Sequence, residues 1–227
     1  MEETLTLESV DVDGAIRETA EAAAGDTRAR FLARAGMLGG GVIGSGALLG
    51  LMADGARAQS SSDVAILNYA LTLEYLEAAF YAEAVRMGGL RGELRTFARV
   101  VAGHEATHVK ALKQVLGSAA VKKPKFNFRG TTQSAKAFKA TAQVLEDTGV
   151  AAYKGQAPRI KNDAVLRAAL AIHTVEARHA AWIRDIRGQN PAPLAFDKPL
   201  SMNQVLARVA STRFIVQRRA AEPPFTG

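Results

Sequence analysis

The chain has 227 residues, of which 48% are hydrophobic, and its formal net charge is +7. This length and composition suffice to bury one substantial core, while the absence of cysteine excludes disulfides, zinc ribbons, iron–sulfur clusters and thiol nucleophiles. A basic charge fits nucleic acid or anionic polymers as partners. We nevertheless expect no specific nucleic-acid partner, because the lysines and arginines are scattered without the interleaved aromatic residues that single-strand binders use.

The first 58 residues differ in composition from the rest and have the layout of an export signal. An acidic head, residues 1–26, has a net charge of −7, and a basic stretch with Arg28 and Arg30 follows it. The next nineteen uncharged residues, 35–53, include seven glycines. A basic stretch followed by a weakly apolar run is typical of a segment that the export machinery recognises.

We expect cleavage after Ala58, at the end of a small-residue motif, which would place the mature protein in the periplasm or outside the cell. The glycine-rich run resembles a twin-arginine signal, although Ala29 separates the two arginines. A retained membrane anchor and an interaction helix are the alternatives that remain open. In this interpretation residues 1–58 are the acidic head and signal, and residues 59–227 are one helical domain with a C-terminal extension.

Four long segments after the signal have apolar residues at helical spacing, and a shorter segment with a capping-box start follows them. Glycines end three of the long segments, and we expect Thr132 to cap the third and a turn at Gly155 and Pro158 to end it. The predicted helices cover residues 63–87, 91–116, 132–154, 162–187 and 201–216.

The connections between these helices predict how they pack. The first and second helices are joined by a tight turn, as are the third and fourth, so each pair forms an antiparallel hairpin. The fourteen-residue connection 118–131 can reach about 46 Å, which exceeds the length of a 25-residue helix at about 37 Å. The prediction is an all-α four-helix bundle with a long crossover between the second and third helices, plus a C-terminal helix.

Each half of the predicted bundle carries the same arrangement of acids, histidines and tyrosines. An isolated Glu lies 31 residues before a Glu-x-x-His motif in the first half and 30 residues before one in the second. A tyrosine follows each isolated Glu by seven residues, nearly in line with it on the helix. In the first half these residues are Glu74, Tyr81, Glu105 and His108, and in the second they are Glu146, Tyr153, Glu176 and His179.

Six of these side chains match the ligands that two neighbouring metal ions need between four helices. Carboxylates supply negative charge between and around the ions, and neutral imidazoles complete each coordination sphere. We therefore predict two iron or two manganese ions per chain, with Glu105 and Glu176 as bridges; carboxylate and imidazole suit both metals. The predicted ligands are Glu74, Glu105, His108, Glu146, Glu176 and His179.

The heights of these residues along the bundle agree better in the first half than in the second. Glu74 and Glu105 lie at similar distances from their turn, within roughly one helical turn. With the predicted helix ends, Glu146 and Glu176 differ by roughly two turns.

Residues 104–108 also spell H-E-x-x-H, the zinc signature of many metalloproteases. That class needs a third protein ligand, but Gln114 stands at the position of the third histidine, and no acidic residue lies between Glu105 and Glu146. The second motif has Val175 in place of the leading histidine. We therefore reject the protease interpretation and expect His104 to be incidental.

Several nearby residues have more than one interpretation. Glu77 is an additional ligand, a supporting acid, or the true ligand in place of Glu74. We favour Glu74 as the ligand, because the spacing between Glu74 and its tyrosine repeats in the second half. His173 should face inward and donate or accept a hydrogen bond beside the site. Tyr69, Tyr75 and Trp182 fit packing better than redox roles.

The stretch LNYALTLEYLEAAFY, residues 67–81, together with the two Glu-x-x-His motifs, resembles the ferritin-like superfamily, and within it the exported bacterial ferritin-like and desiccation-related proteins. The resemblance covers residues 61–187 and implies a ferritin-like bundle. Relatives in the superfamily include ferroxidases, rubrerythrin-type peroxidases, manganese catalases and oxygen-activating hydroxylases. Without cysteine this chain has no rubrerythrin-type electron donor, and its basic domain disfavours iron storage.

The resemblance therefore implies an exported di-metal oxidoreductase that acts on peroxide, oxygen or ferrous iron in stress defence, with Tyr81 and Tyr153 assisting catalysis. The first alternative is a protein that sequesters metal without turnover, and the second is a scaffold whose metal is structural. The partners would be the small oxidant or the metal ions themselves. The oligomeric state, including a homo-oligomer, stays open.

Overall fold

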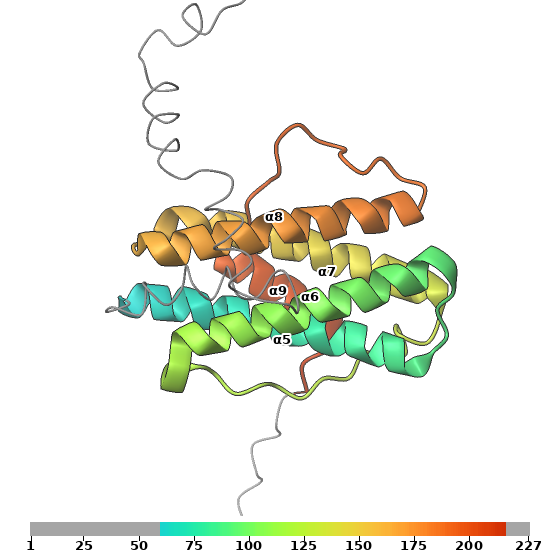
Figure 1. Ribbon diagram of the computed structural model, residues 1–227, viewed down its shortest axis with the longest axis horizontal. Coiled ribbons are helices and arrows are strands. Elements are labelled where there is room, and N and C mark those ends of the chain that lie inside the picture. The colour runs from blue at the N-terminus through green and yellow to red at the C-terminus, as the bar shows by residue number, and fades with distance from the viewer. Residues whose placement is uncertain (1–59, 217–227) are drawn as a thin grey trace, which may run out of the picture. The chain divides into compact units, whose positions relative to one another are not determined.

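The computed structural model describes residues 60–216 as an all-α four-helix bundle followed by one shorter helix (Figure 1). This confirms the predicted fold class. Short 3₁₀ turns extend the connections after the second and third helices. The helices are α5 (Ser61–Met87), α6 (Gly92–Leu116), α7 (Ala135–Gln156), α8 (Asp163–Ile186) and α9 (Met202–Thr212).

The connection between α6 and α7 runs along the bundle, as predicted, and pairs with the segment after α9 (Figure 1). The backbone N–H of Asn127 donates to Phe214 O at 2.8 Å, and that of Val216 donates to Lys125 O at 2.9 Å. These two hydrogen bonds flank an antiparallel bridge between Phe126 and Ile215. The crossover is therefore held by the C-terminal segment and gains backbone partners that a free loop would lack.

Two predicted helix boundaries are wrong for identifiable reasons. Ser134 caps α7, accepting from Ala137 N at 3.1 Å, whereas the Thr132 hydroxyl donates to Glu83 Oε1 at 2.6 Å instead. The C-terminal helix α9 ends at Thr212, earlier than predicted, because Arg213 adopts a left-handed conformation with φ 54°. The residues after Arg213 then turn away to pair with the crossover.

The predicted turn at Gly155 is also wrong, because α7 continues through this glycine to Gln156. Here the backbone of Leu200 crosses the helix: its N–H donates to Ala151 O at 3.1 Å, and a Cβ on Gly155 would lie only 1.9 Å from Leu200 O. The glycine thus serves a close backbone approach within a helix.

The longer α7 corrects the height difference predicted for the second hairpin. The centre of the turn in this hairpin is the midpoint between Gln156, where α7 ends, and Asp163, where α8 begins. It lies about 13 residues after Glu146 and about 17 before Glu176. The remaining offset is about one helical turn. Both hairpins can therefore bring their glutamates to the same level of the bundle.

Two large clusters of buried apolar side chains pack around that level. One is aromatic, with Phe80 stacked on Phe138 at a centroid distance of 5.2 Å and Tyr81 edge-on to both rings. The other is mainly aliphatic and includes Leu71 and Leu112. Together they surround a layer of buried polar side chains in the core.

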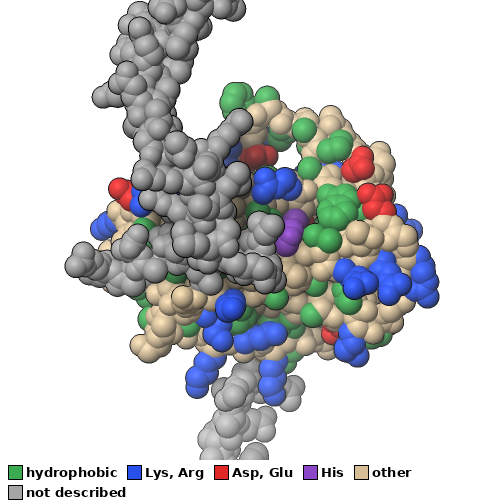
Figure 2. Space-filling view, in the orientation of Figure 1, with side chains coloured by type: hydrophobic (Ala, Val, Ile, Leu, Met, Phe, Trp, Pro, Cys, Tyr) green, Lys and Arg blue, Asp and Glu red, His purple; other side chains and the backbone are tan. Residues whose placement is uncertain are grey.

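The surface of the described part is more basic than its interior. Figure 2 shows lysine and arginine side chains at several places on the visible face, with fewer acidic side chains. Five of the domain's glutamates are instead buried in the core: Glu74, Glu77, Glu105, Glu146 and Glu176. Within residues 60–216, no helix has both the length and the apolar character of a membrane span.

Candidate metal centre

The six predicted ligands converge in the polar layer, although they come from four helices. We call this set the cluster. Each member is at most 6% exposed. The pairs from α6 and α8 lie three residues apart, which places both side chains of a pair on one helix face. The cluster consists of Glu74 of α5, Glu105 and His108 of α6, Glu146 of α7, and Glu176 and His179 of α8.

The cluster divides into two overlapping groups of four, each suited to hold one metal ion. In each group, one ligand atom per residue can be chosen so that all four lie within 4.8 Å of one another. Glu105 and Glu176 belong to both groups. The first group adds Glu74 and His108, and the second adds Glu146 and His179. This is the division that the repeated motif predicts.

The carboxylate of Glu105 lies between the two histidines. Its Oε1 is 3.2 Å from His179 Nδ1, and its Oε2 is 3.3 Å from His108 Nδ1. Glu176 Oε1 also lies 3.3 Å from His108 Nδ1. Each imidazole thus turns Nδ1 toward the carboxylates, and the two oxygens of Glu105 face different metal-binding groups, as a bridging ligand requires.

The other two glutamates are held crosswise by the tyrosines. Tyr153 of α7 donates to Glu74 Oε1 at 2.6 Å, and Tyr81 of α5 donates to Glu146 Oε1. The second oxygen of each glutamate lies 3.2 Å from the Nδ1 of its own group's histidine, His108 or His179. The sequence places each tyrosine in line with the glutamate of its own helix, but the hydrogen bond reaches the glutamate of the opposite half.

The charges in this layer are unbalanced in a way that fits metal ions. Five buried glutamates face two histidines, and within residues 60–216 no lysine or arginine forms an ion pair with them. Among the described residues, Oε2 of Glu176 has no polar partner, while Oε1 of Glu176 and Oε1 of Glu105 have only the long contacts to histidine Nδ1 given above. Buried carboxylates without partners are costly. Two divalent cations would neutralise most of this charge and use these oxygens.

The pKa values of the glutamates reflect this crowding. Burial, followed by repulsion from Glu105, raises the pKa of Glu74 to about 8. Burial and the neighbouring carboxylates also raise the pKa of Glu176 well above its usual range. Although burial alone would raise it, hydrogen bonds from His108 and His179 hold the pKa of Glu105 below its usual range. The cluster therefore resists accumulating negative charge unless cations are added.

Glu77 is a fifth carboxylate at the edge of the cluster and belongs to neither metal-binding group. It is 3% exposed, and its Oε1 has no hydrogen-bond partner among the described residues. A Cβ on Gly149 would lie 2.7 Å from Glu176 Oε2 and 3.6 Å from Glu77 Oε1. Gly149 thus makes room for Glu176. One feature of the sequence points to Gly149: it is an isolated glycine within a helical pattern.

The expectation that His104 is incidental is wrong. Its Nδ1 lies 2.8 Å from Nε2 of His179, and the two nearly parallel rings meet edge to edge, with centroids 5.1 Å apart. No spacing within the chain could show this contact, because the two residues come from different helices, α6 and α8. The side chain of His173, by contrast, forms no hydrogen bond within residues 60–216, its buried Nδ1 included, and the residue belongs to neither metal-binding group. The hydrogen bond predicted for it is therefore absent from these residues.

The three aromatic residues assigned to packing do pack. Tyr69 and Tyr75 are buried in the two apolar clusters. Trp182 lies edge-on to Phe97 and donates to Glu93 Oε1 at 2.9 Å.

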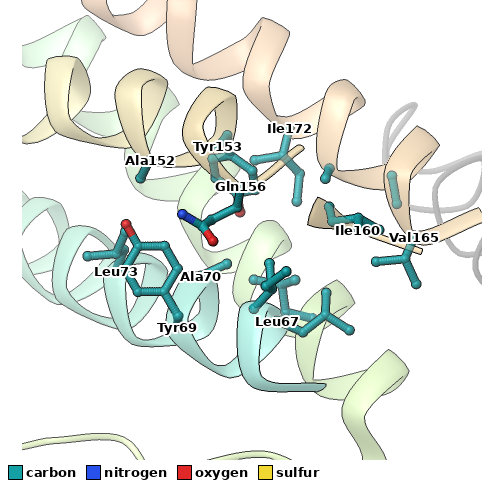
Figure 3. A pocket seen from close by; sticks show the side chains of 14 residues that line it. Leu67, Tyr69, Ala70, Leu73, Ala152, Tyr153, Gln156, Ile160, Val165 and Ile172 are labelled. Atoms are coloured by element: carbon teal, nitrogen blue, oxygen red, sulfur yellow. The ribbon is translucent and has the colours of Figure 1, made fainter. Parts of the chain in front are cut away.

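An apolar pocket of about 20 Å³ adjoins the cluster on the Tyr153 side, between α5, α7 and α8 (Figure 3). Leu73, Ala152 and Ile172 contribute to its wall. The amide of Gln156 points between these helices (Figure 3), and neither of its polar atoms has a hydrogen-bond partner in the described residues. Tyr153 borders both this pocket and Glu74.

Comparison with known proteins supplies the family but not a characterised relative. A search of curated proteins finds no significant match. A family model described as a ferritin-like domain matches residues 62–189, which contain the cluster and both tyrosines. This match spans more than half of the chain, and the protein therefore belongs to the ferritin-like domain family.

Proposed function

We propose that the cluster binds two metal ions, iron or manganese, and that the loaded protein is an oxidoreductase acting on peroxide, oxygen or ferrous iron in stress defence. One observation carries this proposal: two four-residue groups share Glu105 and Glu176, with one ligand atom from each residue of a group within 4.8 Å of the others. A single metal would leave part of the charge unbalanced. Two ions match both the residue types and their division.

The glutamates have distinct roles in this proposal. Glu105 and Glu176 lie between the two positions and would keep the ions at a short, fixed separation. Glu74 and Glu146 each serve one position, with one oxygen held by a tyrosine and the other directed at the cluster. A metal pair supplies Lewis acidity and redox equivalents that the side chains themselves lack.

Tyr81 and Tyr153 act as hydrogen-bond donors beside the reacting position. Burial, and after it the charge of the adjacent Glu146 carboxylate, raises the pKa of Tyr81 well above its usual range. The same causes raise the pKa of Tyr153 next to Glu74. Both phenols therefore keep their protons at neutral pH. They orient the two carboxylates and remain close enough to donate a proton to an oxidant that reaches the cluster.

Turnover by the loaded protein tests the enzyme proposal. We expect hydrogen peroxide consumption, or oxidation of ferrous iron by oxygen or peroxide, that is lost in Glu74→Ala and Glu146→Ala. Tyr81→Phe should lower the rate while metal content stays unchanged, because the phenol orients a ligand without being one.

The same experiment distinguishes the sequestration alternative. A protein that binds two ions tightly but reacts no faster than free metal would be a metal-binding protein without turnover. That result would overturn the oxidoreductase proposal while leaving the metal centre intact.

A further inference from the structure

The two Glu-x-x-His motifs differ in the residue that precedes the glutamate. It is His104 in α6 and Val175 in α8. His104 is exposed, so burial of apolar surface does not explain its position. It nevertheless lies edge to edge with His179, with an interplanar angle of 18° and 2.8 Å between His104 Nδ1 and His179 Nε2.

This contact gives His179 a partner on each ring nitrogen. Its Nδ1 lies 3.2 Å from both Glu105 Oε1 and Glu146 Oε2, on the side of the cluster. Its Nε2 faces His104 Nδ1 on the opposite side. Both ring nitrogens of His179 thus have a polar partner.

The chemistry of imidazole gives this arrangement a consequence. A neutral histidine carries one N–H, and a nitrogen that binds metal must offer its lone pair. In the neutral tautomer whose Nε2–H donates to Nδ1 of His104, Nδ1 of His179 carries no proton. The nitrogen that faces the carboxylates is then free to bind a cation in a fixed orientation.

The other metal-binding group lacks this support. His108 also turns Nδ1 toward the carboxylates, but within residues 60–216 its Nε2 forms no hydrogen bond. The residue that corresponds to His104 is Val175, which has no side-chain acceptor. The two halves, otherwise alike, therefore differ at the outer nitrogen of the histidine.

We propose that His104 is a positioning residue that fixes the tautomer and orientation of His179, so that the two metal positions are unequal. The position of Glu146 and His179 binds its ion more tightly than that of Glu74 and His108. This inference rests on the metal binding of the proposed function, but on none of its turnover. Loss of such an outer partner typically costs about 10–100-fold in metal affinity.

The test is a titration of the metal-free protein with Co²⁺ against a competing chelator, which yields two dissociation constants. In the unmodified protein we expect one ion to bind at least about tenfold more tightly than the other. His104→Ala should raise the smaller dissociation constant by about 10–100-fold and leave the larger one unchanged. His104→Asn, whose Oδ1 can replace Nδ1 as the acceptor, should restore it.

Val175→Ala is the matched control, because it shortens the side chain at the corresponding position of the second motif. It should leave both constants unchanged. The melting temperatures of the metal-free variants report whether each one folds, and we expect no loss in His104→Ala because the side chain is exposed.

Three results would contradict the inference. The first is an unchanged smaller dissociation constant in His104→Ala. The second is an equal rise of both dissociation constants in that variant. The third is a smaller dissociation constant in His104→Asn that stays as high as in His104→Ala. Failure of the unmodified protein to bind two ions would overturn the proposed metal centre as well. A protein that binds two ions but catalyses nothing would leave this inference standing.

Discussion

Gly149 is the residue at which the metal centre is most sensitive to a single added methyl group. In Gly149→Ala, the new Cβ would lie 2.7 Å from Oε2 of Glu176 and force that carboxylate to move. Because Glu176 belongs to both metal-binding groups, we expect metal affinity to fall by about tenfold or more at both positions. Titration with Co²⁺ measures this.

Gly103→Ala is the control for this substitution. Gly103 lies within α6, and a Cβ there would meet nothing within 4 Å. Alanine should stabilise the helix by up to about 1 kcal/mol and leave metal binding unchanged. Equal metal affinity in the two variants would show that Gly149 makes no room for the centre.

The stability of the metal-free protein should fall as the pH rises from about 5 to 8. Burial, then repulsion from Glu105, raises the pKa of Glu74 to about 8. Because this pKa is higher in the folded protein than in the unfolded chain, protonated Glu74 favours the folded state. That contribution is complete below the unfolded value of 4.5 and is lost as the pH rises toward 8. Burial lowers the pKa of His179, but the hydrogen bonds that it donates to Glu105 and Glu146 raise it to about 10, so its contribution is lost in the same direction.

The pKa of Glu105 is shifted in the opposite direction, but this shift does not change the stability between about pH 5 and 8. Its folded-state pKa is depressed, so its contribution to stability is complete above the unfolded pKa and is lost only in stronger acid. Urea denaturation of the metal-free protein at pH 5.5 and pH 8 checks the prediction. Greater stability at the higher pH would contradict it. Metal should restore stability at pH 8, because it binds the folded state.

At the residue scale, the sequence predicted the ligand set, which the structure brings together, but not the residues that support it. The repeated Glu-x-x-His motif identified Glu105 and Glu176, since two copies at matching distances from an upstream Glu are unexpected by chance. Repetition could not identify His104, because the second copy lacks it. The crosswise tyrosine bonds were also beyond the sequence, since spacing along one helix does not give the rotation of its neighbour.

At the scale of the elements, one buried aspartate joins the start of α5 to the start of α8. Asp63 is fully buried, and its two carboxylate oxygens accept from Lys161 N at 3.0 Å and Asn162 N at 3.1 Å. Asp63→Ala would leave these two backbone donors without that partner. We expect a loss of about 1–3 kcal/mol in the free energy of unfolding, measured by urea denaturation of the metal-free protein.

Metal binding distinguishes this effect from damage to the centre. Asp63 lies three helical turns from Glu74, so both metal ions should still bind in Asp63→Ala. A stability loss below about 0.5 kcal/mol would mean that water replaces the carboxylate at little cost.

The helices themselves were largely predictable, and the errors have local causes. Periodicity and glycine stops identified the four long helices and the crossover between them. The end of α7 was misplaced because Gly155 resembles a turn residue, whereas its role depends on Leu200, which is distant in sequence. The end of α9 depends on pairing between Ile215 and Phe126, a contact that helical periodicity does not report.

At the scale of the whole molecule, the domain is basic outside and acidic at its centre. The chain after residue 58 has a charge of +11, yet five glutamates are buried in the core. This distribution opposes a mineral-storing surface and concentrates negative charge where cations would bind. The repeated halves explain how a short sequence builds this centre: each hairpin supplies one Glu and one Glu-x-x-His.

The predicted export signal lies outside the described residues, so export remains a proposal. Cleavage after Ala58 would keep Ser60, whose hydroxyl caps α5 by accepting from Asp63 N at 3.1 Å. We predict that the mature chain starts at Gln59 and that replacing both Arg28 and Arg30 by Gln reduces export. N-terminal sequencing of protein from its natural host checks this. An intact Met1 chain in the cytoplasm would show that residues 1–58 serve another purpose.

Elemental analysis of the loaded protein, which measures metal content per chain, tests whether the cluster is a centre for two metal ions. We expect two ions of iron or manganese per chain, with at least one lost in Glu105→Ala and in His179→Ala. A single zinc ion that survives His179→Ala would contradict it and return the H-E-x-x-H motif of residues 104–108 to consideration.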